Sequence, residues 1–235
     1  MFPVGWVSAA SYASQQRQMI SRPLRNRVDP WGRLNAVPDK AALLMGNRGH
    51  LHDANQAIAR EYPWDGKRWI ACCLHYKGGE PRKGRVFGNS YSELFFLDEA
   101  TAFSAGHRPC RDCQKDRFEE FKAAWRGANP DAVPAASHSI DDIDAFLHGE
   151  RVSENRGKMT YPAELASLPS GTFVEAEGEA VLLWKGKLRR WSFSGYTVGM
   201  DMSAAPTRAT VLTPKSIVRM FVAGFLPTVH PSAEQ

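Results

Sequence analysis

The chain lacks long apolar runs and has few cysteines, and each shortage excludes a class of protein. No stretch approaches the ~20 apolar residues that a membrane-spanning helix needs, so we expect no membrane partner. Four cysteines are too few for a disulfide scaffold, which favours a reducing, cytoplasmic location. Internal repeats and low-complexity tracts are absent, as are phosphate-loop, dinucleotide-binding, nucleophile-elbow and H-E-x-x-H motifs. With 43% hydrophobic and 23% charged residues, the composition is typical of a globular protein.

Acidic residues are scarce in three segments where basic residues gather: 17–27, 77–85 and 185–190. The net charge is +5, and clusters of this kind suit a polyanion, because neutralising phosphates drives sequence-independent binding of nucleic acid. The alternative is a set of charged loops and strand edges that keep the protein soluble. The candidate nucleic-acid-binding residues are Arg22, Arg25, Arg27, Lys83, Arg85, Arg108, Arg111 and Arg151.

The pattern of apolar residues predicts an α+β fold. Alternation over 68–76 predicts a strand that turns Ile70 and Cys72 to one face and Cys73 to the other. Asp98 is the expected N-cap of a helix that Gly106 ends. A helix is predicted over 112–126, with Phe118, Phe121 and Trp125 as its core stripe, and another over 139–148, with Ser139 as its N-cap. A second short strand is predicted over 94–96 and a Pro/Ala linker over 128–137.

The pattern of residue types changes beyond residue 168. Short strands rich in β formers are predicted over 172–176, 180–185 and 188–193, joined by turns at Glu177-Gly178 and Lys185-Gly186. A last helix is expected with Thr213 as its N-cap and Pro214 at its first position, ended by Gly224. We therefore predict a basic N-terminal arm (1–40), a zinc-binding α+β module (41–155), and a small antiparallel β-rich, barrel-like module with a C-terminal helix (165–235).

The cysteines lie in two tight pairs, Cys72-Cys73 and Cys110-x-x-Cys113. A C-x-x-C after Gly and Pro places two thiolates on one turn, where both reach a zinc ion at ~2.3 Å. The alternatives are a redox pair or buried free thiols, but a redox motif normally opens the long helix of a βαβ unit. We therefore expect a structural Zn²⁺ held by Cys110 and Cys113.

Two further ligands must come from elsewhere in the chain. Adjacent strand residues face opposite sides, so Cys72 and Cys73 are not expected to bind one ion together. Cys72 is preferred because it shares a face with apolar residues, and His50 is the preferred fourth ligand because it follows a turn-like segment. Cys73 and His75, which form a C-x-H pair on the other face, are the alternates.

The run 95–118 resembles the zinc-binding N-terminal domain of the bacterial adaptive-response protein Ada. The family pattern is a strand, a helix ending in Ala-Gly-aromatic-Arg-Pro, and a C-x-x-C that opens another helix. The resemblance implies one zinc bound by Cys110 and Cys113, contact with DNA, and Arg108 near phosphate. The family's earlier ligand pair, spaced C-x-x-x-C or H-x-x-x-x-C, is missing, and the chain has the adjacent Cys72-Cys73 instead.

Two clusters suit catalysis. In the first, His52 and Asp53 can act as base and orienting carboxylate, or bind a cation. In the second, Asp144 and His148 are one helical turn apart, with Glu150 and Arg151 following. The alternative for the second cluster is a helix end where His148 and Arg151 favour the dipole.

These observations favour a zinc-containing nucleic-acid-binding protein, acting on DNA in repair or defence. The first alternative is a hydrolase that acts on nucleic acid and uses the two His/Asp clusters. The second is a non-enzymatic protein-interaction module. Trp69, Tyr91 or Trp191 are candidates to stack on bases.

Overall fold

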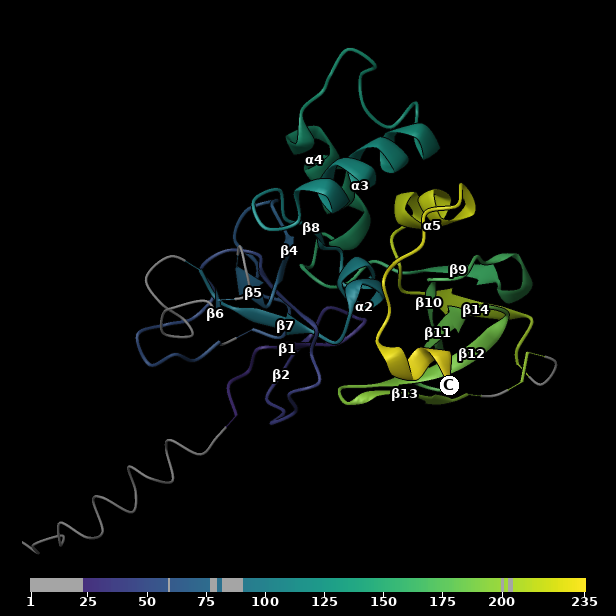
Figure 1. Cartoon of the computed structure of the whole chain (residues 1–235), viewed down its shortest axis with the longest axis horizontal. Helices are drawn as coiled ribbons and strands as arrows, with labels where there is room; N and C mark the ends of the chain where they lie inside the picture. The colour runs from purple at the N-terminus through teal and green to yellow at the C-terminus, as the bar shows by residue number, and fades with distance from the viewer. Residues whose placement is uncertain (1–22, 59, 77–79, 82–90, 200, 203–204) are drawn as a thin grey trace, which may run out of the picture.

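The computed structural model describes residues 23–58, 60–76, 80–81, 91–199, 201–202 and 205–235. Two six-stranded sheets lie on either side of a short central helix, and the described residues form three further α-helices beside them (Figure 1). The prediction of an α+β fold with a β-rich module is confirmed. None of the helices in these described ranges is long and apolar enough to cross a membrane.

The first sheet has the strand order β2-β1-β7-β3-β4-β8. Its strands are β1 (Arg27–Val28), β2 (Leu34–Asn35), β3 (Leu44–Asn47), β4 (Ile70–Cys73), β7 (Leu94–Phe96) and β8 (Arg108–Pro109). A separate pair consists of β5 (His75–Tyr76) and β6 (Glu80–Pro81). Because β1 and β2 belong to the first sheet, the predicted arm of residues 1–40 is in its described part a component of the first module.

The predicted alternation along β4 is seen in its packing. Ile70 and Cys72 pack with Met45 on one face of the sheet, whereas Ala71 packs with Val28 on the other. The last strand, β8, runs parallel to β4 and pairs Ile70 with Arg108. This parallel pairing brings the sequence after β8 to the same end of the sheet as the end of β4.

Helix α2 (Glu99–Ser104) follows the first sheet and is buried along its whole length. Asp98 caps it as predicted, because its carboxylate accepts the Thr101 N–H. Gly106 follows the C-cap with φ of +88°, and His107 N–H donates to Ala102 O at 2.8 Å. This arrangement is a Schellman ending, which requires a left-handed residue and explains the glycine.

Helices α3 (Lys115–Ala128) and α4 (Ile140–Arg151) form the upper part of the molecule in Figure 1. Helix α3 begins three residues later than predicted, because the Cys110–Cys113 turn occupies the preceding residues and Gln114 is the N-cap. Its predicted aromatic stripe, Phe118, Phe121 and Trp125, is buried. Helix α4 has the predicted N-cap, since Ser139 Oγ accepts the Asp141 N–H.

The second sheet has the order β13-β12-β11-β10-β14-β9 and all its pairs are antiparallel. Its strands are β9 (Tyr161–Glu164), β10 (Phe173–Ala176), β11 (Glu179–Trp184), β12 (Lys187–Ser192), β13 (Gly195–Val198) and β14 (Arg208–Val211). Positive φ at Glu177 and Gly178 and at Lys185 and Gly186 gives the two tight turns that the sequence predicts. In the described residues β13 and β9 are edges, so the sheet does not close into a barrel.

Helix α5 (Lys215–Val222) packs against the helices of the first module rather than on its own sheet alone. Ile217, Met220 and Phe221 share a cluster with Phe121 and Trp125. The capping differs from the prediction: Pro214 is the N-cap, while Thr213 Oγ1 accepts the Phe173 N–H at 2.9 Å. A 3₁₀ turn, Leu165–Ser167, follows β9, and another, Pro231–Glu234, ends the chain.

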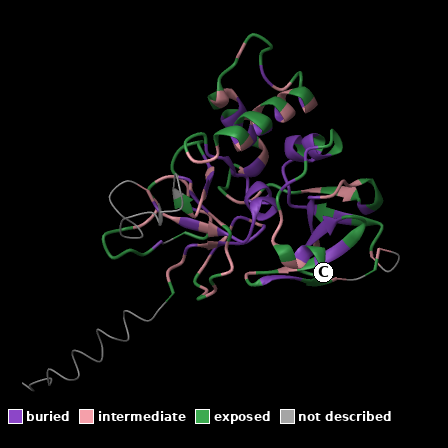
Figure 2. Cartoon of the chain, viewed as in Figure 1, coloured by how far each residue is buried: buried purple, intermediate pink, exposed green. Residues whose placement is uncertain are grey.

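Buried segments of both modules lie near α2, in the centre of Figure 2. Leu97 and Ala100, from the start of α2, pack with Phe173 and Leu182 of the second sheet. Helix α2 therefore packs with both predicted modules. Among the described residues, the modules are joined by direct side-chain contacts and not only by the chain that connects them.

Candidate metal centre

Three of the four cysteines converge where β4 ends and α3 begins. The Cys110 N–H donates to Ala71 O at 2.8 Å, which continues the β4–β8 pairing and places Cys110 beside Cys72. The turn that follows closes when Gln114 N–H donates to Cys110 O at 3.0 Å, bringing Cys113 back to the same point. The thiols of Cys72, Cys110 and Cys113 all lie within 4.8 Å of one another and form a group that can hold a metal ion.

The thiols perturb one another's titration, as expected when metal ligands are crowded together. Hydrogen bonds from the Cys113 and Cys72 thiols, followed by backbone N–H groups of Cys113 and Asp112, lower the pKa of Cys110 well below its ordinary value. Hydrogen bonding to Cys110 and Cys113 raises the pKa of Cys72, and hydrogen bonding to Cys110 raises that of Cys113. One thiolate is therefore favoured without a cation, and a bound cation allows all three to be deprotonated.

Cys73 is the remaining thiol of the chain and lies against the same turn. Its N–H donates to Cys113 Sγ at 3.4 Å, and its own Sγ donates to Cys113 O at 3.5 Å. N–H groups directed at a cysteine sulfur stabilise the thiolate form that binds metal. Cys73 was predicted only as an alternate, because strand alternation places its side chain away from Cys72; the end of β4 at Cys73 weakens that expectation.

The predicted histidine ligands lie elsewhere. His50 Nε2 contacts His52 Nε2 at 3.1 Å in an exposed pair of rings. His75 is exposed on β5. All histidines and cysteines of the chain lie among the described residues, and neither ring joins the cysteine group there. Of the preferred ligand set, Cys72, Cys110 and Cys113 lie together in the structure, whereas His50 lies apart from them.

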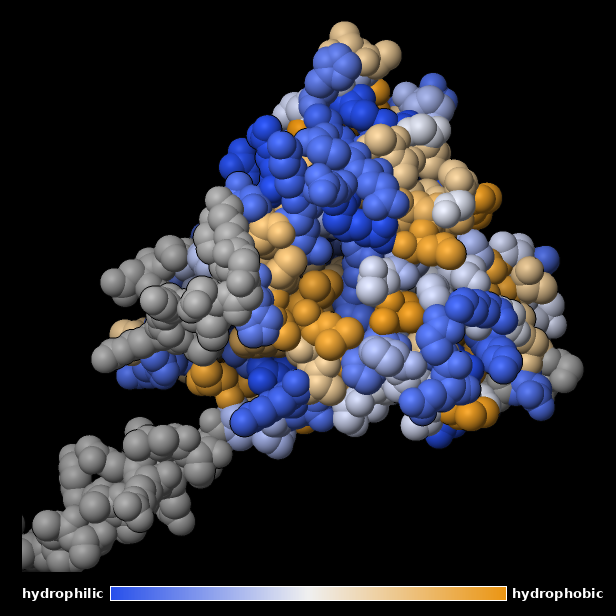
Figure 3. Space-filling model, in the orientation of Figure 1, coloured by the Kyte–Doolittle hydropathy of each residue, from blue (hydrophilic) through white to orange (hydrophobic). Residues whose placement is uncertain are grey.

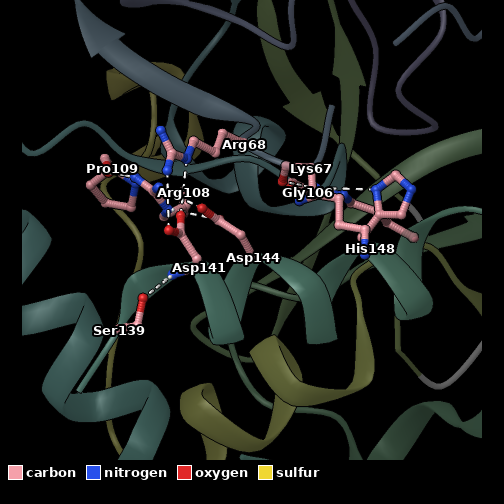
Figure 4. A network of polar contacts seen from close by, with 10 residues as sticks. Lys67, Arg68, Gly106, Arg108, Pro109, Ser139, Asp141, Asp144 and His148 are labelled. Carbon is pink, nitrogen blue, oxygen red and sulfur yellow. Dashed lines mark hydrogen bonds and ion pairs between the residues drawn. The ribbon is translucent and has the colours of Figure 1, made fainter. Parts of the chain in front are cut away.

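Arg108, which was expected near phosphate, has a different partner in the structure. Its guanidinium donates to both carboxylate oxygens of Asp144, at 2.9 and 2.7 Å, and both side chains are almost fully buried (Figure 4). A third donation, to Pro109 O at 3.1 Å, keeps the strand and its neighbouring turn in place. A guanidinium engaged in this way joins β8 to α4 and does not face a surface ligand.

Other predicted phosphate contacts also have local partners. Arg25 donates to Leu34 O at 2.8 Å, and Arg27 donates to Asp39 O at 2.9 Å while lying over the Phe95 ring. Arg151 is buried, and Arg111 is exposed between the two cysteines of the turn. The remaining predicted contacts lie outside the described residues: Arg22, Lys83 and Arg85.

The second predicted catalytic cluster does not assemble. Asp144 turns to Arg108, while His148 lies at the other end of the view in Figure 4, against the Trp64 ring at 4.6 Å. Burial, followed by the nearby Arg151, lowers the pKa of His148 to about 4. Glu150 accepts the Ser216 N–H at 3.0 Å and so caps α5. These positions are explained by packing and capping.

The first predicted catalytic cluster is also held by local hydrogen bonds. Asp53 Oδ1 accepts the N–H groups of Asn55 and Ala57, at 2.8 and 2.9 Å, which forms a tight loop. His52 Nδ1 lies 2.8 Å from Ser92 Oγ, and that hydroxyl also accepts the Leu51 N–H at 2.8 Å. Because Ser92 is fully buried, this pair resembles a loop anchor more than a nucleophile with its base.

The three aromatic residues that were predicted to stack on bases also have local packing partners. Trp69 is buried between two guanidinium groups, those of Arg48 at 4.7 Å and Arg151 at 4.2 Å. The Trp191 Nε1–H donates to Thr101 Oγ1 at 3.1 Å, and its ring packs on the cluster that contains Phe173 and Leu182. Tyr91 packs beside the cysteine group.

A group of basic residues around Trp69 was not predicted to lie together. Arg48 and Arg151 are buried there, and the half-buried Lys158 donates to Ser104 O. Nothing in the spacing of Arg48 or Lys158 distinguishes them from surface residues. The one sequence signal is the number of tryptophans, 7 in the chain, because arginine side chains are commonly stacked on such rings.

Comparison with models of known protein families, with curated proteins and with solved structures finds no match to this chain. The geometry of its own residues is therefore the basis for a functional conclusion.

Proposed function

We propose that the chain is a zinc-containing nucleic-acid-binding protein in which the metal has a structural role. The convergence of three thiols on one point supports the metal part of the proposal. Thiolates are the ligands that zinc prefers in closed structural sites, at a Zn–S distance of ~2.3 Å. Three thiols held together by a turn between a strand and a helix are suited to binding one tetrahedral ion.

Cys73 supplies the fourth ligand in this proposal. Its side chain already contacts the Cys113 backbone, so a change of its χ1 rotamer moves the sulfur without moving the strand. A site with four cysteines has no open position for water or substrate, which makes the metal structural rather than catalytic. The ion would join β4, the turn after β8 and the start of α3.

The nucleic-acid part of the proposal is supported by charge. The chain carries a net charge of +5, and Arg111 extends from the turn that holds two ligands. The basic segments 17–27 and 77–85 add cations on either side of β4 in the sequence. The outer face of α3, hydrophilic in Figure 3, contains both Lys115 and Asp116, so it contributes little net charge.

A salt titration of zinc-loaded protein with fluorescent single-stranded and duplex DNA tests the nucleic-acid part. If six or more phosphates are contacted, affinity falls by about 10³-fold or more between 50 and 200 mM salt. Arg111→Gln is expected to lower the slope of log K against log salt by about 1. Arg68→Gln is the matched control, because that exposed arginine is paired with Asp141 and lies outside the three basic segments.

Absence of binding at 50 mM salt would remove nucleic acid as the partner. A flat salt dependence would do the same, since phosphate contacts release counterions. Neither result bears on the metal, which a separate measurement of metal content tests.

A further inference from the structure

A narrow pocket is lined by Trp69, the residue before β4, and by Ala105, which packs in the same cluster as Ala71. The cysteine group packs with Met45 on the other face of the sheet. The empty space of the pocket is about 220 Å³, open solvent included. The walls are aromatic and cationic. The residues that line it are Trp31, Gly32, Arg48, Tyr62, Trp64, Trp69, Ala105, Arg151, Val152, Arg156, Gly157 and Lys158. Among these described residues there is no carboxylate.

Two of the cations are buried and only partly hydrogen-bonded. Arg48 is 0% exposed and Arg151 is 1% exposed. Arg48 Nη2 donates to Gly32 O at 2.9 Å, while its Nε and Nη1 have no hydrogen-bond partner. Arg151 donates to Gly106 O at 2.6 Å and Lys67 O at 2.5 Å, while its Nε has none. The Trp64 Nε1–H is a further buried donor without a partner in the same pocket.

The charges around this pocket are not balanced by the protein. Burial lowers the pKa of Arg48 and of Arg151 to about 9, and that of Lys158 to about 7. Asp29 acts on Arg48 and Lys158, but it already accepts the Arg33 N–H at 2.9 Å and an Asn35 amide hydrogen at 3.2 Å. Asp144 acts on Arg151 but is paired with Arg108.

An anion would satisfy both deficits. Buried cations are costly unless they are paired, and buried donors are costly unless they are hydrogen-bonded. The aromatic rings do not form a cage for a cationic ligand, since guanidinium groups already cover them: Arg48 and Arg151 lie over Trp69, and Arg156 lies over Trp64. The unpartnered N–H groups are donors alone, which fits a group of oxygen acceptors.

We propose that this pocket binds one phosphate-type oxyanion, held by the free N–H groups of Arg48, Arg151 and Trp64. The inference does not rest on the metal centre or on nucleic-acid binding. The pocket is too narrow for a nucleoside, so the ligand enters as a compact tetrahedral head, with the exposed Arg156 side chain turned aside at the mouth. Two sources offer this chemistry, free inorganic phosphate and the terminal phosphate of an oligonucleotide.

Thermal unfolding of the full-length protein with added inorganic phosphate, in chloride buffer at constant ionic strength, tests the site. At phosphate 100-fold above Kd, the Tm is expected to rise by about 5–10 °C. Arg48→Met is expected to lose this rise and, without phosphate, to unfold no earlier than the unmodified protein. A structural arginine would instead lower Tm in both buffers.

Arg189→Met is the matched control, because Arg189 is also buried with an unpartnered Nε but does not line the pocket. This variant keeps the phosphate response. Should Arg48→Met fail to fold, Trp64→Phe decides the question, since it removes one of the three proposed donors and is expected to weaken phosphate binding at least several-fold. The proposal is overturned if neither inorganic phosphate nor a 5′-phosphorylated oligonucleotide raises the Tm, or if the pocket variants show an equal rise.

A second arm distinguishes the two sources. Short oligonucleotides with a 5′-phosphate or a 5′-hydroxyl are compared with inorganic phosphate in the same assay. A rise with the 5′-phosphate alone assigns the site to a nucleic-acid end, and a rise with inorganic phosphate assigns it to the free ion. Either result requires the loss of response in Arg48→Met.

Discussion

Arg108 and Asp144 form the most buried ion pair among the described residues, with side chains 5% and 1% exposed. The two parallel hydrogen bonds satisfy both oxygens of Asp144 and two of the Arg108 nitrogens. Breaking a buried pair leaves an uncompensated charge, whereas replacing both partners removes the desolvation cost as well. At the scale of single residues, this pair fixes the position of the turn that carries Cys110.

Arg108→Met is expected to lower the free energy of unfolding by about 3–5 kcal/mol, because Asp144 is left buried without a cation. The double variant Arg108→Met with Asp144→Leu recovers most of that loss. Urea denaturation measures both. Arg68→Ala, which breaks the exposed Arg68–Asp141 pair, is the control and changes stability little. Equal losses of stability in Arg108→Met and Arg68→Ala would contradict the role assigned to the buried pair.

The lowered pKa of His148 predicts that the stability of the folded protein depends on pH. Its pKa in the folded protein is lowered to about 4 from 6.5 by burial, so between these pH values the unfolded chain binds more protons than the folded chain. Stability is therefore expected to fall as pH drops from 6.5 to 4, and this contribution levels off below 4.

His148→Gln is expected to reduce that fall, measured as the urea midpoint at several pH values. His138→Gln, at an exposed histidine, is the control. His107 is buried, and its pKa is also lowered, first by burial and then by Arg48, so part of the dependence remains in the His148 variant. An unchanged profile in His148→Gln would refute the assignment.

At the scale of elements, α2 is the connection between the two sheets. The Asp98 carboxylate accepts four hydrogen bonds: from Thr101 N–H and Oγ1, from Tyr196 Oη and from the His230 N–H. The N-cap that the sequence predicts thus also binds the second sheet and the segment before the last 3₁₀ turn.

Asp98→Ala is expected to destabilise the protein by roughly 2–4 kcal/mol, because it removes a helix cap and leaves buried donors unpaired. Chemical denaturation of this variant is compared with Ser139→Ala. Ser139 caps α4 with one exposed hydrogen bond to Asp141, so its loss costs about 0.5–1 kcal/mol. Similar costs at the two caps would show that Asp98 does not join the sheets.

Local signals predicted most of the elements, and long-range contacts explain what they missed. The caps Asp98 and Ser139 depend on residues two or three positions away, and the turns at Gly178 and Gly186 depend on a positive φ, so all four were predictable. Strands β1 and β2 are two residues each and pair across the sheet, which leaves too short a pattern to read.

In the proposed metal centre, too, local patterns predicted some residues and long-range contacts determine the others. Cys110 and Cys113 are close in sequence, and the shared face of β4 indicated Cys72. Alternation along β4 favoured His50 over Cys73 as the proposed fourth ligand, because it places the Cys73 side chain on the face opposite Cys72. The contact of Cys73 with Cys113 depends on the long-range pairing of β4 with β8, which the spacing of the cysteines does not indicate. The buried Arg48 gave no local signal, since it packs on Trp69, which is distant in sequence.

At the scale of the whole molecule, the metal group lies where several elements meet. Helix α3, which begins at the cysteine turn, packs on α5 from the second module, and α2 packs on the second sheet. A ligand that stabilises the turn therefore stabilises both modules, because it binds the folded chain and not the unfolded one. Metal removal is expected to lower the Tm of one cooperative transition by about 10 °C or more.

The direct test is the zinc content of purified protein, measured by elemental analysis alongside thiol titration. We expect one zinc per chain and thiols that react only after chelation. Cys110→Ser is expected to lose the metal, whereas Cys73→Ser retains it with weaker affinity. Metal-free protein with four reactive thiols and a Tm that chelation does not change would contradict the account.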